Sequence, residues 1–328
     1  MIKRNINGLL LLDKPYGISS NKALQIIKHL YAATKSGHTG TLDPMATGVL
    51  PICLGEATKF SSILLNARKT YEAVLKLGYQ STTGDVEGEI KKISNARSDN
   101  LSIRDCESIL RQFVGETLQT PPMYSALKYC GKPLYAYARK GEIIKRKART
   151  VFIYDIKVDS LTGDELKISV ECGTGTYIRT LAEDIGKALG CGSAYLIGLR
   201  RSAVGDFDLS KSQMLKAIEN MNREDRDGCL LPVDSLLSDI PSIQLDEEEA
   251  QYLLTGRVLS AKPDSINFTL PMKTENKTQD VRLYYRQQFL GLGEINMSLS
   301  LKPKRLMSTS YMTVPYHFAA NQSCLEEM

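Results

Sequence analysis

The chain has 328 residues, of which 42% are hydrophobic and 24% charged, and its formal net charge is +5. These values fit a folded protein of one large domain or two ordinary ones, and they exclude wholesale disorder. No apolar run approaches the ~20 residues that span a bilayer, and the longest early run is too short for a signal peptide. We therefore expect a cytoplasmic protein that has no membrane partner.

Cysteine and histidine usage bears on metal binding. Seven cysteines and three histidines are scattered along the chain, and no two cysteines have CxxC spacing. This pattern disfavours both a disulfide framework and a zinc site. We expect reduced thiols and no metal.

The first predicted elements lie in the N-terminal quarter of the chain. Residues 9–12 are consecutive leucines and predict a short buried strand. The next segment has helical spacing of its apolar residues, with Ser19 or Ser20 as the cap. Residues 36–47 are rich in Gly, Thr and Pro without a period, which predicts a loop. Apolar and polar residues alternate over 71–77, which predicts a strand.

The middle of the chain mixes helices and strands. Ser102 and Asp105 have the spacing of a capping box, which predicts a helix. Strands are predicted at 151–158 and 166–170, and a helix at 177–189, before a glycine. Because these elements do not alternate as βαβ units, we expect an α+β fold with a mixed, largely antiparallel sheet.

The pattern of the C-terminal part predicts a small second domain. Pro232 and Pro241 bracket a junction, after which Asp246 can cap a short helix. Residues 281–297 predict strands that turn at the Gly-x-Gly triplet starting at Gly291. Periodicity is then lost, which predicts a disordered tail. We expect a first domain, a β-rich second domain and a tail at residues 1–240, 241–306 and 307–328.

One stretch of the first domain is strongly basic and rich in tyrosine. Between Lys128 and Arg149 it has eight Lys or Arg residues and one acid, Glu142. Cations that bind phosphates, interleaved with rings that stack on bases, are typical of binding to single-stranded or loop RNA. From the pattern alone, a solvated helix face or a mobile loop is an equally good interpretation.

The segment 37–48 carries the clearest chemical signal. It holds three glycines, which permit close backbone approach to a ligand. Pro44 disfavours the helical region for Asp43 and so presents its carboxylate on extended backbone. A carboxylate in a loop beside a histidine can act as a nucleophile, a general base or an electrostatic stabiliser. From these residues alone, an aspartate that merely orders a turn is the simpler interpretation.

A family resemblance favours a chemical role for Asp43 over a role in ordering a turn. Residues 37–50, GHTGTLDPMATGVL, resemble the GHTGxLDPxATGxL signature of the TruB family of tRNA pseudouridine synthases. Thr41 departs from the commoner alanine, and residues 306–328 extend past the usual end. Further matches follow in family order at residues 13–20, 55–59, 69–71, 121–128, 175–179, 199–201 and 302–305.

The resemblance implies a fold, an activity and a partner. It implies a pseudouridine-synthase catalytic domain followed by a small PUA-like domain that binds RNA. The basic stretch, at about residues 120–150, would be an insertion that closes over the T arm of tRNA. The expected reaction converts uridine 55 of the T loop to pseudouridine, with base flipping and without a cofactor. We expect a monomer that needs no protein partner.

The resemblance also assigns roles to matching residues. Asp43 would be the catalytic aspartate and Arg179 its ion-pair partner. Tyr71 would stack on the flipped uracil and could serve in proton transfer. His38 would fill the space that the flipped nucleotide leaves. Each has a plainer alternative, such as a surface pair between Arg179 and Glu183.

Four further residues are candidates for substrate binding. Tyr177 and Leu199 would be walls of the base pocket, although both could be ordinary core residues. Lys14 and Lys59 are weaker candidates for RNA or structural contacts. Two other functions remain open from the sequence: an enzyme that modifies another RNA, and a non-catalytic RNA-binding or tRNA-folding module.

Overall fold

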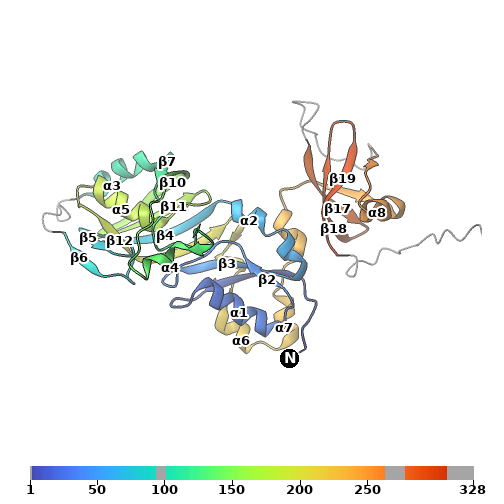
Figure 1. The fold of residues 1–328 in the computed structure, drawn as a ribbon, viewed down its shortest axis with the longest axis horizontal. Helices are drawn as coiled ribbons and strands as arrows, with labels where there is room; N and C mark the ends of the chain where they lie inside the picture. The colour runs from blue at the N-terminus through green and yellow to red at the C-terminus, as the bar shows by residue number, and fades with distance from the viewer. Residues whose placement is uncertain (1, 94–100, 263–277, 309–328) are drawn as a thin grey trace, which may run out of the picture. The chain divides into compact units, whose positions relative to one another are not determined.

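The computed structural model describes residues 2–93, 101–262 and 278–308 (Figure 1). The chain divides into two compact units, Met1–Leu231 and Pro232–Met328. The predicted tail lies outside the described residues from residue 309 onward. No helix in the part of the chain that the structure describes is long and apolar enough to cross a membrane.

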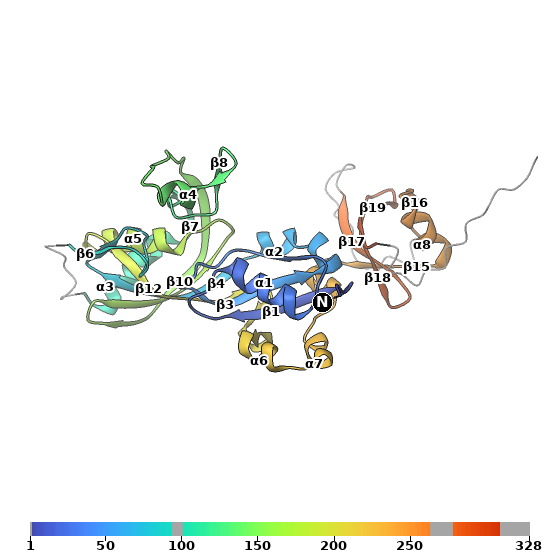
Figure 2. The same cartoon turned by 60° about the horizontal axis from the view of Figure 1, so that its bottom comes forward.

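The first unit is built on a ten-stranded sheet (Figures 1 and 2). Two strand pairs, β1 with β14 and β3 with β12, are parallel, and the other pairs are antiparallel. This confirms the predicted α+β fold. In spatial order the strands are β14 (Gln213–Met214), β1 (Gly8–Lys14), β3 (Thr47–Leu54), β12 (Ala194–Val204), β4 (Lys69–Leu77), β11 (Glu165–Cys172), β10 (Arg149–Thr162) and β7 (Gly115–Gln119), with β2 (Ser36–His38) beside β3 and β13 (Phe207–Asp208) beside β12.

Helices and two small hairpins complete this unit. The hairpins are β5–β6 (Tyr79–Ser81 and Ile90–Lys92) and β8–β9 (Lys128–Tyr129 and Lys132–Pro133). The helices are α1 (Ser20–Leu30), α2 (Ser62–Asn66), α3 (Ile103–Leu110), α4 (Leu134–Ala138), α5 (Ile178–Ala188), α6 (Leu215–Asn220) and α7 (Arg223–Gly228).

Helix starts follow the predicted caps. The Ser19 side chain accepts a hydrogen bond from the backbone N–H of Lys22 at the start of α1. Ser102 and Asp105 form the predicted capping box of α3. Helix α5 lies within the predicted range 177–189, and its buried face packs on the sheet. Local polar signals therefore identify α1 and α3 correctly, whereas the prediction of α5 rested on the glycine that follows it.

The predicted loop at 36–47 is partly wrong. Residues Ser36–His38 form β2, which pairs with β3, and Thr47 already belongs to β3. The loop proper is therefore 39–46. Strand β2 is held by backbone hydrogen bonds to its neighbour, so its side chains need no apolar alternation.

The second unit is β-rich, as predicted. Its sheet has the order β15 (Ser242–Leu245), β17 (Gln279–Tyr285), β18 (Gln288–Ile295), β19 (Ser300–Leu306) and β16 (Leu259–Ser260). Helix α8 (Glu247–Leu254) begins with a capping box between Asp246 and Glu249.

The turn predicted at Gly291 is wrong. Gly291 and Gly293 lie within β18, and the chain turns between β17 and β18 at Arg286, which has a φ of 54°. A Cβ on Gly291 would lie 2.4 Å from the carbonyl oxygen of Arg305 on β19. The glycine is therefore needed for close packing of two strands, not for a turn.

Candidate active site

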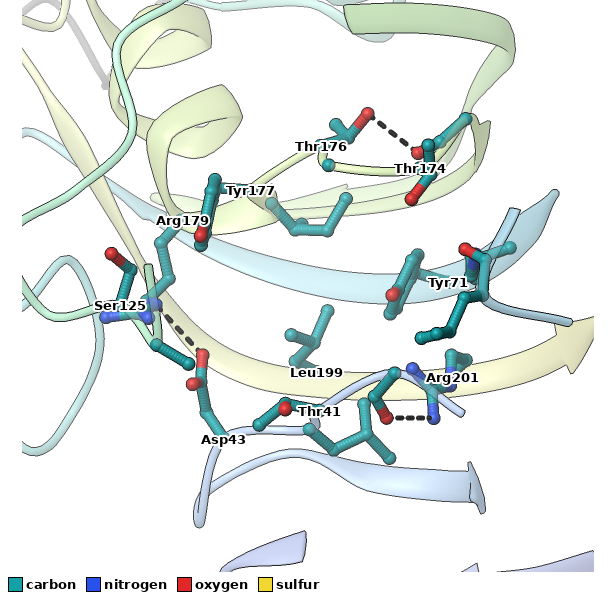
Figure 3. Close-up of a pocket in the computed structure, with 18 of the residues that line it drawn as sticks. Thr41, Asp43, Tyr71, Ser125, Thr174, Thr176, Tyr177, Arg179, Leu199 and Arg201 are labelled. Carbon is teal, nitrogen blue, oxygen red and sulfur yellow. Dashed lines mark hydrogen bonds and ion pairs between the residues drawn. The ribbon is translucent and has the colours of Figure 1, made fainter. Parts of the chain in front are cut away.

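A pocket of about 330 Å³ opens in the first unit beside the loop 39–46. This volume lies at the lower end of the range for small-ligand sites, about 300–1,000 Å³. Strands β4 and β12, the loop, the segment leading into α5 and residues 125–127 contribute its lining (Figure 3). Asp43, Tyr71, Tyr177, Arg179 and Leu199 all line it, so the fold brings five predicted site residues together.

Lys14 supports the loop that carries Asp43. Its side chain is fully buried, and its ammonium donates to the carbonyl oxygens of Pro15 (2.8 Å), Ile18 (2.7 Å) and Pro44 (3.4 Å). Burial lowers the pKa of Lys14 to about 8, and the nearby Asp43 carboxylate opposes that shift. The role seen for Lys14 is structural.

Arg201 and Ser20 also hold this loop. Arg201 is 1% exposed, and its guanidinium donates to the carbonyls of Val49 (2.7 Å) and Gly40 (3.3 Å). The buried Ser20 hydroxyl donates to the Leu42 carbonyl at 2.8 Å and accepts from the Leu42 N–H at 2.7 Å. The loop is thus a rigid support for a reactive side chain, although it contains Gly40.

The carboxylate of Asp43 forms an ion pair with Arg179. Asp43 Oδ2 lies 3.0 Å from Arg179 Nε, and the arginine side chain is 6% exposed (Figure 3). The same guanidinium donates to the carbonyls of Thr83 (2.9 Å) and Tyr124 (2.7 Å), and it lies 3.7 Å from Asp85 Oδ2. Arg179 is therefore a buried hub rather than one partner of a surface pair.

Two opposed effects act on the Asp43 carboxyl. Burial raises its pKa above the ordinary aspartate value, and the Asp85 charge acts in the same direction. Arg179, and more weakly Lys14, lower the pKa. Burial is the largest of these effects, so the net shift is upward.

Tyr71, Tyr177 and Leu199 form the apolar walls of the pocket. Tyr71 lies on β4 between Val170 of β11 and Arg201 of β12. Burial raises the pKa of its hydroxyl, which Arg201 partly opposes, so the hydroxyl stays protonated at neutral pH. Tyr177 is the residue before α5, and Leu199 is 8% exposed on β12.

Three predicted residues, Lys14, His38 and Lys59, lie outside the pocket lining. His38 is on β2, opposite Ile52, and its Nδ1 is buried without a hydrogen-bond partner. Burial lowers the pKa of this imidazole. Lys59 forms an ion pair with Glu56 at 2.8 Å.

Lys69 and Arg201 line the pocket, although neither was predicted as a site residue. Lys69 is 7% exposed, and its ammonium donates to the carbonyls of Leu65 and Ala67, both at 2.6 Å. Burial lowers its pKa to about 8. Both residues lie in matched motifs, Lys69–Tyr71 and Leu199–Arg201. Their position in these motifs was the one sequence feature that could have indicated a role for them.

The basic stretch between β7 and β10 stands away from the sheet (Figure 2). It contains the β8–β9 hairpin and α4, so it is not one continuous helix. Tyr129 and Tyr137 pack edge to face, with ring centroids 5.9 Å apart. Most of its lysines and arginines are exposed. The residues between β7 and β10, 120–148, are called the basic lobe below, and they present both positive charge and aromatic rings.

Family models match most of the chain between residues 28 and 307. The model for the N-terminal domain of the TruB family pseudouridylate synthases matches residues 28–178. The model for the tRNA pseudouridylate synthase B C-terminal domain matches residues 179–238. The model for the C-terminal part of pseudouridine synthase II TruB matches residues 241–307.

Named relatives and a solved structure are also similar to this chain. The chain is 53% identical to the tRNA pseudouridine synthase B of Nitrosospira multiformis, over 93% of this chain and 96% of that protein. It is 51% identical to the tRNA pseudouridine synthase B of Nitrosomonas europaea, over 91% and 95%. A chain in the crystal structure of a Cbf5–Nop10–Gar1 complex has the same fold, with a TM-score of 0.66 and 24% identity over 91% of this chain and 84% of that one.

Proposed function

Because this chain belongs to the TruB family of pseudouridine synthases, we propose that it converts uridine 55 in the T loop of tRNA to pseudouridine. The observation that carries the proposal is the Asp43–Arg179 ion pair at the wall of a pocket that Tyr71 also lines. A carboxylate held by a buried guanidinium beside an aromatic ring suits chemistry on a flipped pyrimidine nucleoside.

The reaction needs an anionic oxygen and a shaped pocket. It breaks the C1′–N1 bond, rotates the uracil and joins C5 to C1′; the hydrogen at C5 leaves as a proton, and N1 gains a proton from the solvent. Asp43 supplies the anionic oxygen, and Arg179 holds it in place and favours its ionised form. Because the isomerisation involves no net oxidation or reduction, the proposed chemistry can be carried by side chains alone.

The pocket walls offset the cost of base flipping. Extruding a nucleotide costs a few kcal/mol, and stacking a base on an aromatic ring returns about 1–3 kcal/mol. Tyr71 offers such a ring, and Tyr177 and Leu199 complete the apolar lining. His38 would occupy the space that the nucleotide leaves.

The RNA-binding surface extends beyond the pocket in this proposal. The basic lobe would clamp the T arm, because it combines exposed cations with tyrosines. The C-terminal unit would add affinity for tRNA rather than chemistry. The enzyme would act as a monomer without a protein partner.

Tritium release tests the proposal. The substrate is tRNA labelled at C5 of uridine, since forming the new C5–C1′ bond expels that hydrogen. We expect release by the native protein, none from a tRNA with cytidine at position 55, and none by Asp43→Asn. Asp159→Asn, which changes an exposed aspartate of β10, is the matched control and should stay active. Tight tRNA binding without any release would overturn the proposal.

A further inference from the structure

The basic lobe joins the sheet at a neck formed by two paired residues. Gln119 is the last residue of β7 and Arg149 is the first of β10, and the two are direct partners in the strand register. The side chains of both residues contact the segment Gly175–Tyr177, which leads into α5 and forms part of the pocket wall.

Gln119 clamps the backbone of Tyr177 with both ends of its amide. Its Nε2 donates to the Tyr177 carbonyl at 3.0 Å, and its Oε1 accepts from the Tyr177 N–H at 2.7 Å. Gln119 is 3% exposed, so water competes little for either bond. Tyr177 is the N-cap of α5, and its own side chain makes no capping bond. The amide therefore satisfies the N–H at this helix start and fixes the backbone from which the pocket ring projects.

Arg149 acts on the same segment from the opposite strand. Its Nη2 donates to the Gly175 carbonyl at 2.6 Å, and its guanidinium carbon lies 5.2 Å from the centroid of the Tyr177 ring. A third link joins the lobe to the site, because Arg179 donates to the carbonyl of Tyr124 at 2.7 Å. The beginning and end of the lobe are thus tied to the residues on both sides of the α5 start.

We propose that Gln119 is a positioning residue that couples the basic lobe to the catalytic site. The inference rests on the proposed function and extends it. Through its clamp on Tyr177, Gln119 sets the direction of the pocket ring and, two residues later, the place of Arg179. If the lobe moves when it binds RNA, the contact between Gln119 and Tyr177 would transmit this movement to the Asp43–Arg179 pair. Misplacement of reacting groups by about 1 Å can lower a rate by about 100-fold.

Gln119→Met tests the proposal, because it keeps the length of the side chain and removes both hydrogen bonds. The single-turnover rate, the Kd for tRNA and the thermal midpoint are measured together. We expect a rate at least tenfold lower, with a Kd within threefold of the native value. Asn7→Ala is the matched control, since Asn7 also accepts from a distant backbone N–H, that of Glu56 at 2.8 Å, and does not line the pocket. The control should lower the midpoint and leave the rate unchanged.

Gln119→Glu adds a readout that a purely structural role would not move. Its carboxylate can accept from the Tyr177 N–H but repels the Tyr177 carbonyl, whereas the protonated carboxyl can both accept and donate. We therefore expect the ratio of variant rate to native rate to rise as the pH falls from 9 to 6. Taking the ratio cancels the titration of Asp43, which both proteins share.

The outcomes separate the two claims. Absence of tritium release by the native protein overturns the proposed function. Native activity with Gln119→Met within twofold of the native rate, and a lowered midpoint as in Asn7→Ala, overturns only the positioning role of Gln119.

Discussion

Arg179 Nε lies 3.0 Å from Asp43 Oδ2, although 135 residues separate the two positions along the chain. Asp43 is held on a loop that Lys14 supports, and Arg179 on the first turn of α5. The guanidinium also binds the carbonyls of Thr83 and Tyr124. One buried cation therefore joins the loop, the segment after β5 and, through Tyr124, the first part of the basic lobe. Its removal should affect stability as well as catalysis.

Arg179→Met should abolish tritium release and lower stability. The substitution leaves Asp85, which is 2% exposed, and two main-chain carbonyls without their cationic partner. We expect the free energy of unfolding to fall by about 3 kcal/mol, the lower end of the range for a broken buried ion pair, because Asp43 is 33% exposed. Urea unfolding measures this free energy. Lys187→Met, an exposed change on the same helix, should shift stability by less than about 0.5 kcal/mol. A stable Arg179 variant would contradict the hub role.

Much of the fold could be predicted because its signals are local. The cap at Ser19, the capping box at Ser102 and the alternation in β4 each depend on neighbouring residues. Strand β12 could not be predicted, because Arg200 and Arg201 interrupt its apolar pattern. Arg200 pairs with Asp13 of β1 at 2.7 Å, and Arg201 donates to the carbonyls of Val49 in β3 and Gly40 in the loop. Such contacts become visible only when distant segments are placed together.

Contacts between distant segments also limit what the sequence could predict about the site. The family resemblance indicated Asp43, Tyr71 and Arg179, whose residue types define the chemistry. It did not indicate a role for Gln119, since an amide that binds backbone atoms 58 residues away leaves no pattern in the sequence. The assignment of Lys14 as an RNA contact was an open alternative, and its burial now favours a structural role.

The acid side of the pH–rate profile should reflect Asp43. Burial raises the pKa of this carboxyl above its ordinary value, about 3.9. Because the proposed chemistry uses the ionised form, activity should be present above the raised pKa and lost as the pH falls through it. The measurement is the single-turnover rate from pH 4 to 8, with circular dichroism to confirm folding at each pH. A rate that stays constant down to pH 5 would show that Asp43 titrates normally or is not required as an anion.

Lys14→Met should impair the rate more than RNA binding. The ammonium donates to three partly buried carbonyls, among them that of Pro44, next to Asp43. Leaving one buried acceptor unsatisfied costs about 1–3 kcal/mol, and the Asp43 loop loses its support. We expect a rate at least tenfold lower with a nearly unchanged Kd for tRNA. Lys22→Met, an exposed change on α1, is the control and should match the native protein in both measurements.

Neutralising exposed lysines of the basic lobe should weaken the salt dependence of tRNA binding. The double change of Lys145 and Lys147 to Gln removes two exposed cations. Each lost phosphate contact should reduce the slope of log K against log salt by about 0.7–0.9. Lys216 and Arg223 lie in α6 and α7, which Figure 2 shows on the other side of the sheet from α4, and their double change to Gln is the control. Equal slopes for the two variants would mean that the lobe does not contact the RNA backbone through these lysines. A reduced slope confined to the Lys145 and Lys147 variant, with the rate at saturating enzyme retained, would assign these two lysines to binding rather than chemistry.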